Sequence, residues 1–194
     1  GCAFPLDRHM SLTQIGPGMQ GYPKGIVLLT GTLGSGKTTV AIEVARVAEG
    51  RGVPCAAIDL DWLCWVHPRV PITDSQRDNL ILQNLLSLWF NFHGVGVEYL
   101  VLARALLDDT LLAALERVFP QTRVTVLRID ASPQTIERRL TRRDTGEILE
   151  EHLRQSAAIT IAVEKAALED AIVLNDCERV SDVAQQVLDV LAWK

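Results

Sequence analysis

The segment of the sequence richest in chemistry is a run of eight residues that contains three glycines, a lysine and a threonine. Residues 31–38 are GTLGSGKT, which matches the pattern G-x-x-x-x-G-K-[ST]. The glycines allow the backbone to turn inward, so that successive N–H groups and the positive end of a following helix point at one phosphate. Lys37 can then neutralise the β- and γ-phosphates of a nucleoside triphosphate, and the hydroxyl of Thr38 can bind Mg²⁺. We expect the following residues to bind the nucleotide: Gly31, Thr32, Gly34, Ser35, Gly36, Lys37, Thr38 and Thr39.

The elements around this segment are those that such a loop requires. Residues 26–29 (IVLL) form an apolar run typical of a strand buried in a parallel sheet, and residues 40–48 repeat small apolar side chains at helical spacing. A strand before the glycines and a helix after them distinguish a phosphate-binding P-loop from an ordinary turn. We therefore interpret residues 31–39 as a P-loop.

A pair of carboxylates follows the next predicted strand. Asp59 and Asp61 come directly after residues 56–58, and ligands of open α/β sheets bind beyond the carboxyl ends of the strands. A carboxylate at this place can align an acceptor hydroxyl and take its proton. We expect Thr38 and Asp59 to hold the metal, while the sequence leaves open which aspartate is the base. The alternative is that either aspartate only caps the next helix.

A cluster of arginines lies on a later predicted helix. Arg142 and Arg143 follow Arg139, and residues 144–146 (DTG) provide a turn at which a lid could hinge. Arginine donors that close over the phosphates stabilise the charge that develops during transfer and exclude water. We expect Arg143 first and Arg142 second to do this, and Arg139 to bind the nucleotide. The alternative is that the cluster is a solvated helix surface.

Aromatic side chains follow the aspartates. Trp62, Trp65 and His67 lie just after them, and Arg104 lies at the end of the third predicted strand. An aromatic wall suits stacking on a sugar or a planar ring and offers few charges to hold an anion. We expect these four residues to contact the acceptor.

The size and the order of the elements predict one α/β domain. The chain has 194 residues and a mass of 21.4 kDa, the length of a single domain. Strands that alternate with helices predict a three-layer sandwich, with a parallel sheet covered on both faces. We assign the domain to residues 25–194 and expect residues 1–24 to be a flexible arm, in part a cloning remnant. Strands are expected at residues 26–29, 56–58, 99–102, 124–129 and 171–174.

Charge and composition exclude several classes. The net charge is −5 and the isoelectric point is near 5.4, which argues against a broad nucleic-acid footprint. The sequence has no apolar stretch long enough to cross a membrane and no signal-peptide core, so we expect a cytoplasmic protein. The four cysteines are scattered, which argues against a zinc site or a disulfide framework. The chain also lacks the motif with which GTPases recognise the guanine base. Motor ATPases have an acidic residue at the end of the third strand, and this chain has none there.

The P-loop, the D-x-D-x-L motif at residues 59–63 and the R-L-x-x-R motif at residues 139–143 together resemble the small P-loop kinases. This group contains adenylylsulfate (APS) kinase, gluconate kinase and chloramphenicol phosphotransferase, and the chain is most similar to uncharacterised actinobacterial members that carry an ATPase label. The resemblance implies a five-stranded sheet of order 2-3-1-4-5, a short lid, and ATP and Mg²⁺ as cosubstrates. Cys64 stands where adenylylsulfate kinases have an arginine that grips an anionic substrate.

The leading hypothesis is an ATP-dependent kinase that phosphorylates a hydroxyl of a small, weakly charged molecule such as a sugar, a nucleoside or a natural product. One alternative is a nucleotide-binding regulatory module with little or no ATPase activity. The other is a kinase that acts on the ends of RNA or DNA, against which the acidic composition argues.

Overall fold

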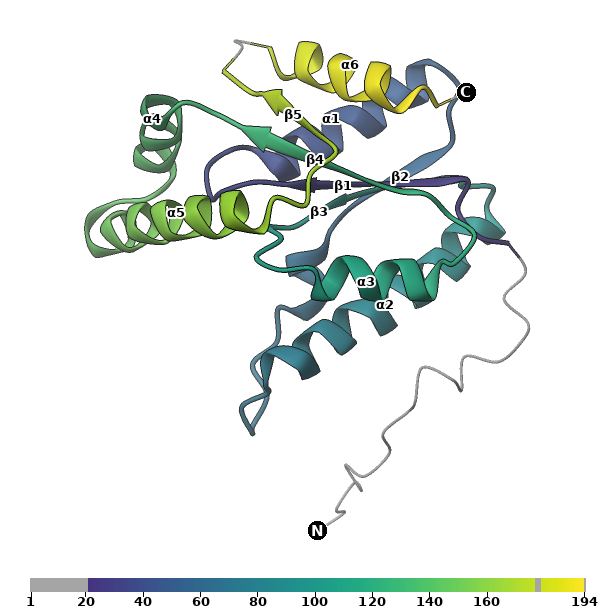
Figure 1. Cartoon of the computed structure of the whole chain (residues 1–194), viewed down its shortest axis with the longest axis horizontal. Helices are drawn as coiled ribbons and strands as arrows, with labels where there is room; N and C mark the ends of the chain where they lie inside the picture. The colour runs from purple at the N-terminus through teal and green to yellow at the C-terminus, as the bar shows by residue number, and fades with distance from the viewer. Residues whose placement is uncertain (1–20, 177–178, 194) are drawn as a thin grey trace.

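Five parallel strands form one sheet at the centre of the molecule (Figure 1). The computed structural model describes residues 21–176 and 179–193. The strands are β1 (Gly25–Thr30), β2 (Cys55–Asp59), β3 (Tyr99–Ala103), β4 (Val124–Asp130) and β5 (Ala171–Leu174). Their order is β2-β3-β1-β4-β5, with every neighbouring pair parallel, which confirms the predicted topology.

Helices cover both faces of the sheet. α1 and α6 lie on one face and α2 and α3 on the other, which confirms the three-layer arrangement (Figure 1). α4 and α5 pack on each other beyond the carboxyl ends of the strands, near the loop that follows β1. The helices are α1 (Lys37–Gly50), the short 3₁₀ helix η2 (Leu60–Cys64), α2 (Asp74–Gly94), α3 (Thr110–Val118), α4 (Pro133–Arg143), α5 (Gly146–Ala166) and α6 (Val180–Leu191).

The central strand β1 is buried on both sides, which explains its unbroken apolar sequence. Ile26 and Leu28 pack into the core beneath α2 and α3, whereas Val27 and Leu29 pack against α1 and α6. Successive side chains of a strand point to opposite faces, so a strand covered twice needs apolar residues at every position. This burial holds the start of the following loop in one place.

Side-chain caps mark the starts of α2 and α4. Thr73 and Gln76 form a reciprocal capping box at the start of α2, and Ser132 caps α4 with a proline at its first position. Ser181 has a side chain of the type that caps helices, and the sequence predicts it as the cap of the last helix, but it does not cap α6. α6 begins at Val180, and Arg179 is the residue that precedes it, with an extended backbone. Ser181 therefore already lies inside the first turn.

The predicted arm falls into two parts. Residues 1–20, which include Cys2, lie outside the described residues, and so does Cys177. Gly21 accepts a hydrogen bond from the indole of Trp89, and Pro23 accepts one from the hydroxyl of Thr122, so residues 21–24 are fastened to the core. Among the described helices, none has the length and apolarity required to cross a membrane.

Candidate active site

The loop between β1 and α1 bends sharply around the N-terminus of α1. Gly31, Gly34 and Gly36 have φ angles of 139°, 85° and 94°, a range that favours glycine. A Cβ at Gly31 would lie 2.3 Å from the carbonyl oxygen of Ile129, and a Cβ at Gly36 would lie 2.5 Å from Nδ2 of Asn175. Only glycine fits these positions, and the bend directs backbone N–H groups and the positive end of α1 at one point. The loop has the form of an anion cradle.

Lys37 is folded over this cradle. Its Nζ donates a 2.8 Å hydrogen bond to the carbonyl oxygen of Thr32. Burial lowers the pKa of Lys37 to about 8, although Asp61 and Asp59 act in the opposite direction. A phosphate placed in the cradle would supply the negative charge that favours the protonated lysine.

Asp59 stands beside the cradle because of the strand order. It pairs in register with Ala103, which itself pairs with Leu29, so β2 ends level with the start of the loop. Asp59 Oδ2 accepts a 2.5 Å hydrogen bond from Thr38 Oγ1, and Oδ1 accepts a 3.0 Å hydrogen bond from the backbone N–H of Asp61, which caps η2. A hydroxyl and a carboxylate next to a phosphate site are oxygen ligands of the kind that Mg²⁺ uses, so these residues fit that ion.

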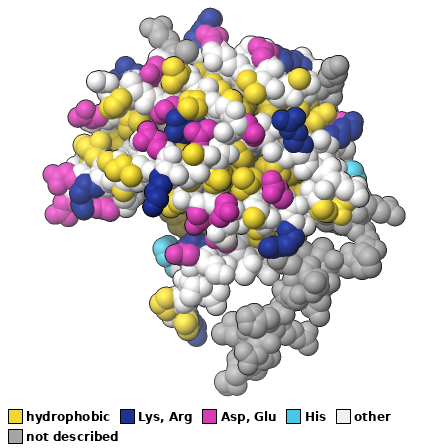
Figure 2. Space-filling view, viewed as in Figure 1, with side chains coloured by type: hydrophobic (Ala, Val, Ile, Leu, Met, Phe, Trp, Pro, Cys, Tyr) yellow, Lys and Arg dark blue, Asp and Glu magenta, His cyan; other side chains and the backbone are white. Residues whose placement is uncertain are grey.

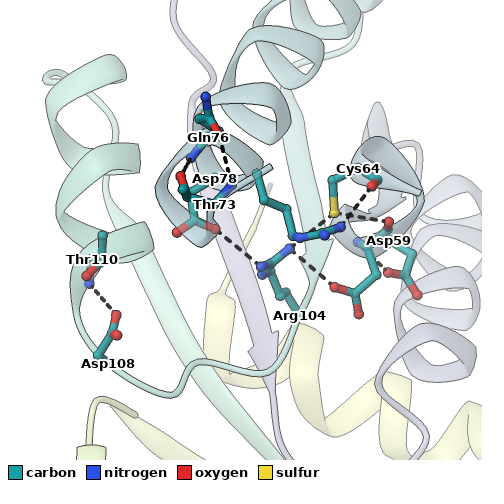
Figure 3. A network of polar contacts seen from close by, with 10 residues as sticks. Asp59, Cys64, Thr73, Gln76, Asp78, Arg104, Asp108 and Thr110 are labelled. Carbon is teal, nitrogen blue, oxygen red and sulfur yellow. Dashed lines mark hydrogen bonds and ion pairs between the residues drawn. The ribbon is translucent and has the colours of Figure 1, made fainter. Parts of the chain in front are cut away.

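Asp61, two residues after Asp59, has a different set of partners. Arg104 Nη1 lies 3.3 Å from Asp61 Oδ1 and 3.8 Å from the sulfur of Cys64, while Nη2 lies 3.2 Å from Asp78 Oδ1. Figure 3 shows Arg104 between Asp78 and the segment that contains Asp59 and Cys64. The pKa of Asp61 is raised, first because its carboxylate is partly withdrawn from water, and Arg104 opposes this effect. Arg104 therefore favours the ionised form of Asp61.

Arg139 braces the cradle from α4. Its Nη1 donates to the carbonyl oxygens of Ser35 and Gly34, at 3.1 and 3.4 Å, and its Nη2 donates to the carbonyl oxygen of Asn175 at 2.7 Å. Asn175 Nδ2 donates to the same oxygen of Ser35 at 2.7 Å. These contacts tie the end of β5 to the loop after β1.

Arg143 lies one turn further along α4 and is held at the junction with α5. Its Nη2 is 2.9 Å from Asp144 Oδ2, and His152 Nδ1 is 2.7 Å from the same oxygen. Hydrogen bonds from Arg143 and then from His152 lower the pKa of Asp144. The guanidinium of Arg143 remains half-exposed and reaches the cavity described next.

One cavity of about 640 Å³ is lined by Lys37, Asp59, Asp61, Arg139 and Arg143, among others. Its lining comes from the loop after β1, the start of α1, the end of β2, η2 and the residue after it, α4, the segment after β5 and the start of α6. The lining residues are Leu33, Gly34, Gly36, Lys37, Thr38, Thr39, Asp59, Asp61, Trp62, Trp65, Arg139, Leu140, Arg143, Asn175 and Val180.

No protein-family model matches the sequence, and no curated protein matches it. Solved structures do match. The APS kinase of Mycobacterium tuberculosis, solved with AMPPNP and APS, is 22% identical, with a TM-score of 0.61 over 88% of this chain and 99% of that one. A sugar kinase from Janibacter is 21% identical, with a TM-score of 0.60 over 88% of this chain and 96% of that one. The shikimate kinase of Acinetobacter baumannii, solved with shikimate, is 18% identical, with a TM-score of 0.55 over 87% of this chain and 93% of that one.

The fold is that of the small P-loop kinases. In this fold the cradle, the two aspartates, and Arg139 and Arg143 of α4 meet at the carboxyl ends of the strands.

Two predicted nucleotide residues have side chains that point away from the cavity. The hydroxyl of Thr32 donates a 2.6 Å hydrogen bond to the carbonyl oxygen of Ser156, whose own hydroxyl donates to Leu33 at 2.9 Å. Ser35 is completely buried, and its hydroxyl has no partner in the described structure. The side chain of Thr32 thus fastens the P-loop to α5, and Thr32 and Ser35 have only backbone N–H groups to offer a phosphate.

Of the other predicted site residues, some line the cavity and some do not. Trp62 and Trp65 line the cavity, with 69% and 68% of their surface exposed. His67 and Arg142 are exposed and do not line it, so the placement of His67 at the acceptor and of Arg142 over the phosphates is not supported. Arg104 does not line it either and instead contacts Asp61, because its side chain is drawn between two carboxylates.

Sequence reasoning missed Asn175, Asp78 and the pair formed by Asp144 and His152. Asn175 is the residue directly after β5, so its position at the carboxyl end of a strand could have marked it. Asp78 lies on α2, remote from Arg104 in sequence, and no local pattern links the two. The contact between Asp144 and His152 joins the two helices that the predicted hinge connects.

Proposed function

We propose that the protein is an ATP-dependent kinase that transfers the γ-phosphate to a hydroxyl of a small, weakly charged molecule. The observation that carries this proposal is the meeting of a glycine cradle, Lys37 and two carboxylates in one cavity. The fold adds support, because solved proteins that share it include kinases bound to AMPPNP and APS or to shikimate. A cavity of about 640 Å³ that must also hold the nucleotide suits a small acceptor.

The nucleotide would occupy the side of the cavity formed by the cradle and α4. Its phosphates would accept hydrogen bonds from the backbone N–H groups of the loop and pair with the charge of Lys37. The rest of the nucleotide would be surrounded by Arg139, Leu140, Asn175 and Val180. Thr38 and Asp59 would hold Mg²⁺, which supplies positive charge against the β- and γ-phosphates when bound.

The acceptor would occupy the side next to Asp61. The acceptor oxygen attacks the γ-phosphorus, the bond from that phosphorus to the β,γ-bridging oxygen breaks, and ADP leaves with the bonding electrons. The hydroxyl proton passes to Asp61, because Asp59 is already bonded to Thr38 and to the start of η2. Arg143 would complete the charge around the transferring group from the lid formed by α4 and the start of α5.

The alternatives have less support from the described residues. A passive nucleotide-binding module gives no role to the contact of Asp61 with Arg104 at the edge of the cavity. For a nucleic-acid end kinase, a basic track leading to the cavity is required. On the face drawn in Figure 2, lysine and arginine side chains are scattered among acidic ones instead.

Label transfer separates these functions. We expect γ-labelled ATP with magnesium and a panel of small hydroxyl compounds to yield a labelled small molecule. The same reaction with RNA and DNA ends should leave them unlabelled. ATP consumption that no acceptor stimulates would overturn the proposal in favour of a regulatory module, and labelled nucleic-acid ends would overturn it in favour of an end kinase.

We expect the affinity for ATP to fall as the pH rises above about 8. Phosphates bind the protonated form of Lys37, whose pKa before binding is about 8, so binding above that pH must take up a proton. Below it the lysine is already charged and the affinity is flat; above it the affinity falls by up to about tenfold per pH unit. Calorimetry over this range measures both the Kd and the proton uptake. Lys37→Arg, which stays charged, should remove the pH dependence, and a flat wild-type profile would contradict the assignment.

A further inference from the structure

The charges along the cavity are distributed unevenly between its two ends. The cations among the described lining residues belong to the start of α1 and to α4, on the side of the cradle: Lys37, Arg139 and Arg143. Their charges match those of a bound triphosphate. The end of β2 and the segment through η2 contribute Asp59, Asp61, Trp62 and Trp65 to the lining, and this part of the described lining contains no lysine or arginine. An acceptor beside Asp61 and the two indoles therefore meets carboxylates and aromatic rings.

Arg104, the cation closest to Asp61, is already engaged. It lies 3.3 Å from Asp61 and 3.2 Å from Asp78, its side chain is only 18% exposed, and it does not line the cavity. Figure 3 shows Arg104 in contact with Asp78 on one side and with the segment that contains Asp59 and Cys64 on the other. The single charge of Arg104 is therefore shared between two carboxylates. An anionic acceptor would meet repulsion from Asp61 with only partial compensation from Arg104.

The two tryptophans add a second preference for positive charge. Trp62 belongs to η2 and Trp65 follows it, and their ring centroids lie 5.5 Å apart with planes inclined at 35°. Both side chains are about two-thirds exposed, at 69% and 68%, although tryptophan side chains are on average highly buried in proteins. The electron-rich face of an indole attracts a cation, more strongly than that of any other side chain. The rings adjoin the carboxylate of Asp61 in the same lining.

We propose that the acceptor is cationic: a small amino alcohol or amino sugar whose ammonium group lies against Asp61 and the indole rings of Trp62 and Trp65. This rests on the proposed kinase function for its chemistry, but the recognition itself needs only the cavity. The ammonium pairs with the carboxylate of Asp61, while a neighbouring hydroxyl faces the γ-phosphate. The names of three solved relatives point to APS, gluconate and shikimate, which are anions, so this chain would differ from them in charge preference.

Three cyclohexane compounds that differ only in the group next to a ring hydroxyl test the charge preference. These are trans-2-aminocyclohexanol, trans-1,2-cyclohexanediol and trans-2-hydroxycyclohexanecarboxylate, which at neutral pH are cationic, neutral and anionic. Binding is measured by calorimetry on the protein with the nonhydrolysable analogue AMPPNP and magnesium, and label transfer is measured separately with γ-labelled ATP. We expect the amino alcohol to bind about tenfold more tightly than the diol, from contributions of the carboxylate and the rings, and the hydroxy acid to bind more weakly still.

The two readouts separate failure of this inference from failure of the kinase proposal. Charge-selective binding without label transfer to any acceptor would support the cationic site and count against the kinase. Label transfer to acceptors without preference for the cation would support the kinase and overturn the cationic site. Equal binding of the three compounds, preference for the acid, or no binding of the amino alcohol would also overturn it.

Substitutions identify which side chains cause the preference for a cationic acceptor. Trp62→Leu and Trp65→Leu should each reduce the ratio of amino alcohol to diol affinity about threefold, because the cation loses a ring face. Asp78→Asn should reduce the same ratio, because Arg104 then neutralises Asp61 more fully. Phe90→Leu is the matched control: Phe90 is 70% exposed on α2 and does not line the cavity, so the ratio should stay unchanged. Unchanged ratios in both tryptophan variants would remove the rings from the site.

Discussion

Replacing Lys37 by alanine is expected to lower the rate of phosphoryl transfer by on the order of a thousandfold or more. The ammonium group lies over the cradle at the start of α1, held by Thr32, where it would meet the β- and γ-phosphates. These oxygens gain charge as the bond to the leaving group breaks, so the loss is greater in the transition state than in the bound nucleotide. Single-turnover transfer from γ-labelled ATP measures the chemical step directly.

Two further variants serve as controls for the Lys37→Ala result. Lys165→Ala removes an exposed lysine from the last turn of α5, outside the cavity, and should leave the rate unchanged. Lys37→Arg keeps the charge but not the compact ammonium, and should recover part of the binding and little of the rate. Full turnover by a folded Lys37→Ala protein would remove the P-loop lysine from the mechanism.

Replacing Asp61 by asparagine is expected to lower kcat by about 10²- to 10⁴-fold while the Kd for ATP changes little. The amide keeps the shape of the carboxylate but cannot accept the hydroxyl proton. Asp59→Asn should behave differently, because Asp59 bonds to Thr38, the residue with which we propose that it holds Mg²⁺. That variant should require a higher magnesium concentration for half-maximal activity. Initial rates over a grid of magnesium and acceptor concentrations distinguish the two effects.

A matched control is available for the aspartate series. Asp109 precedes α3, forms no side-chain cap and does not line the cavity, so Asp109→Asn should leave both kcat and the magnesium requirement unchanged. Circular dichroism of each variant checks that the fold is intact. If Asp61→Asn and Asp59→Asn both transferred phosphate at the wild-type rate, the carboxylate pair would have no part in the reaction.

The order of the elements and the cradle could be predicted because their causes are local. An unbroken apolar run, a glycine-rich turn and a small-residue helix follow one another within about 25 residues, and backbone preferences of that kind depend on near neighbours. The arrival of Asp59 at the cradle was also predictable, because the carboxyl ends of parallel strands meet at one edge of the sheet. The start of α6 was not, because Ser181 carries a capping side chain that the local backbone does not use.

The sequence by itself determined that a phosphate cradle, a carboxylate pair and an arginine helix belong to one parallel α/β domain. Only the tertiary structure decided which side chains face the cavity. Arg104 contacts Asp61 and does not line the cavity, because Asp78 of α2 holds its guanidinium on the other side. Arg139 stabilises the loop after β1, because β5 places Asn175 beside it. These contacts join residues tens of positions apart. Their geometry depends on the packing of whole elements, which no spacing along the chain encodes.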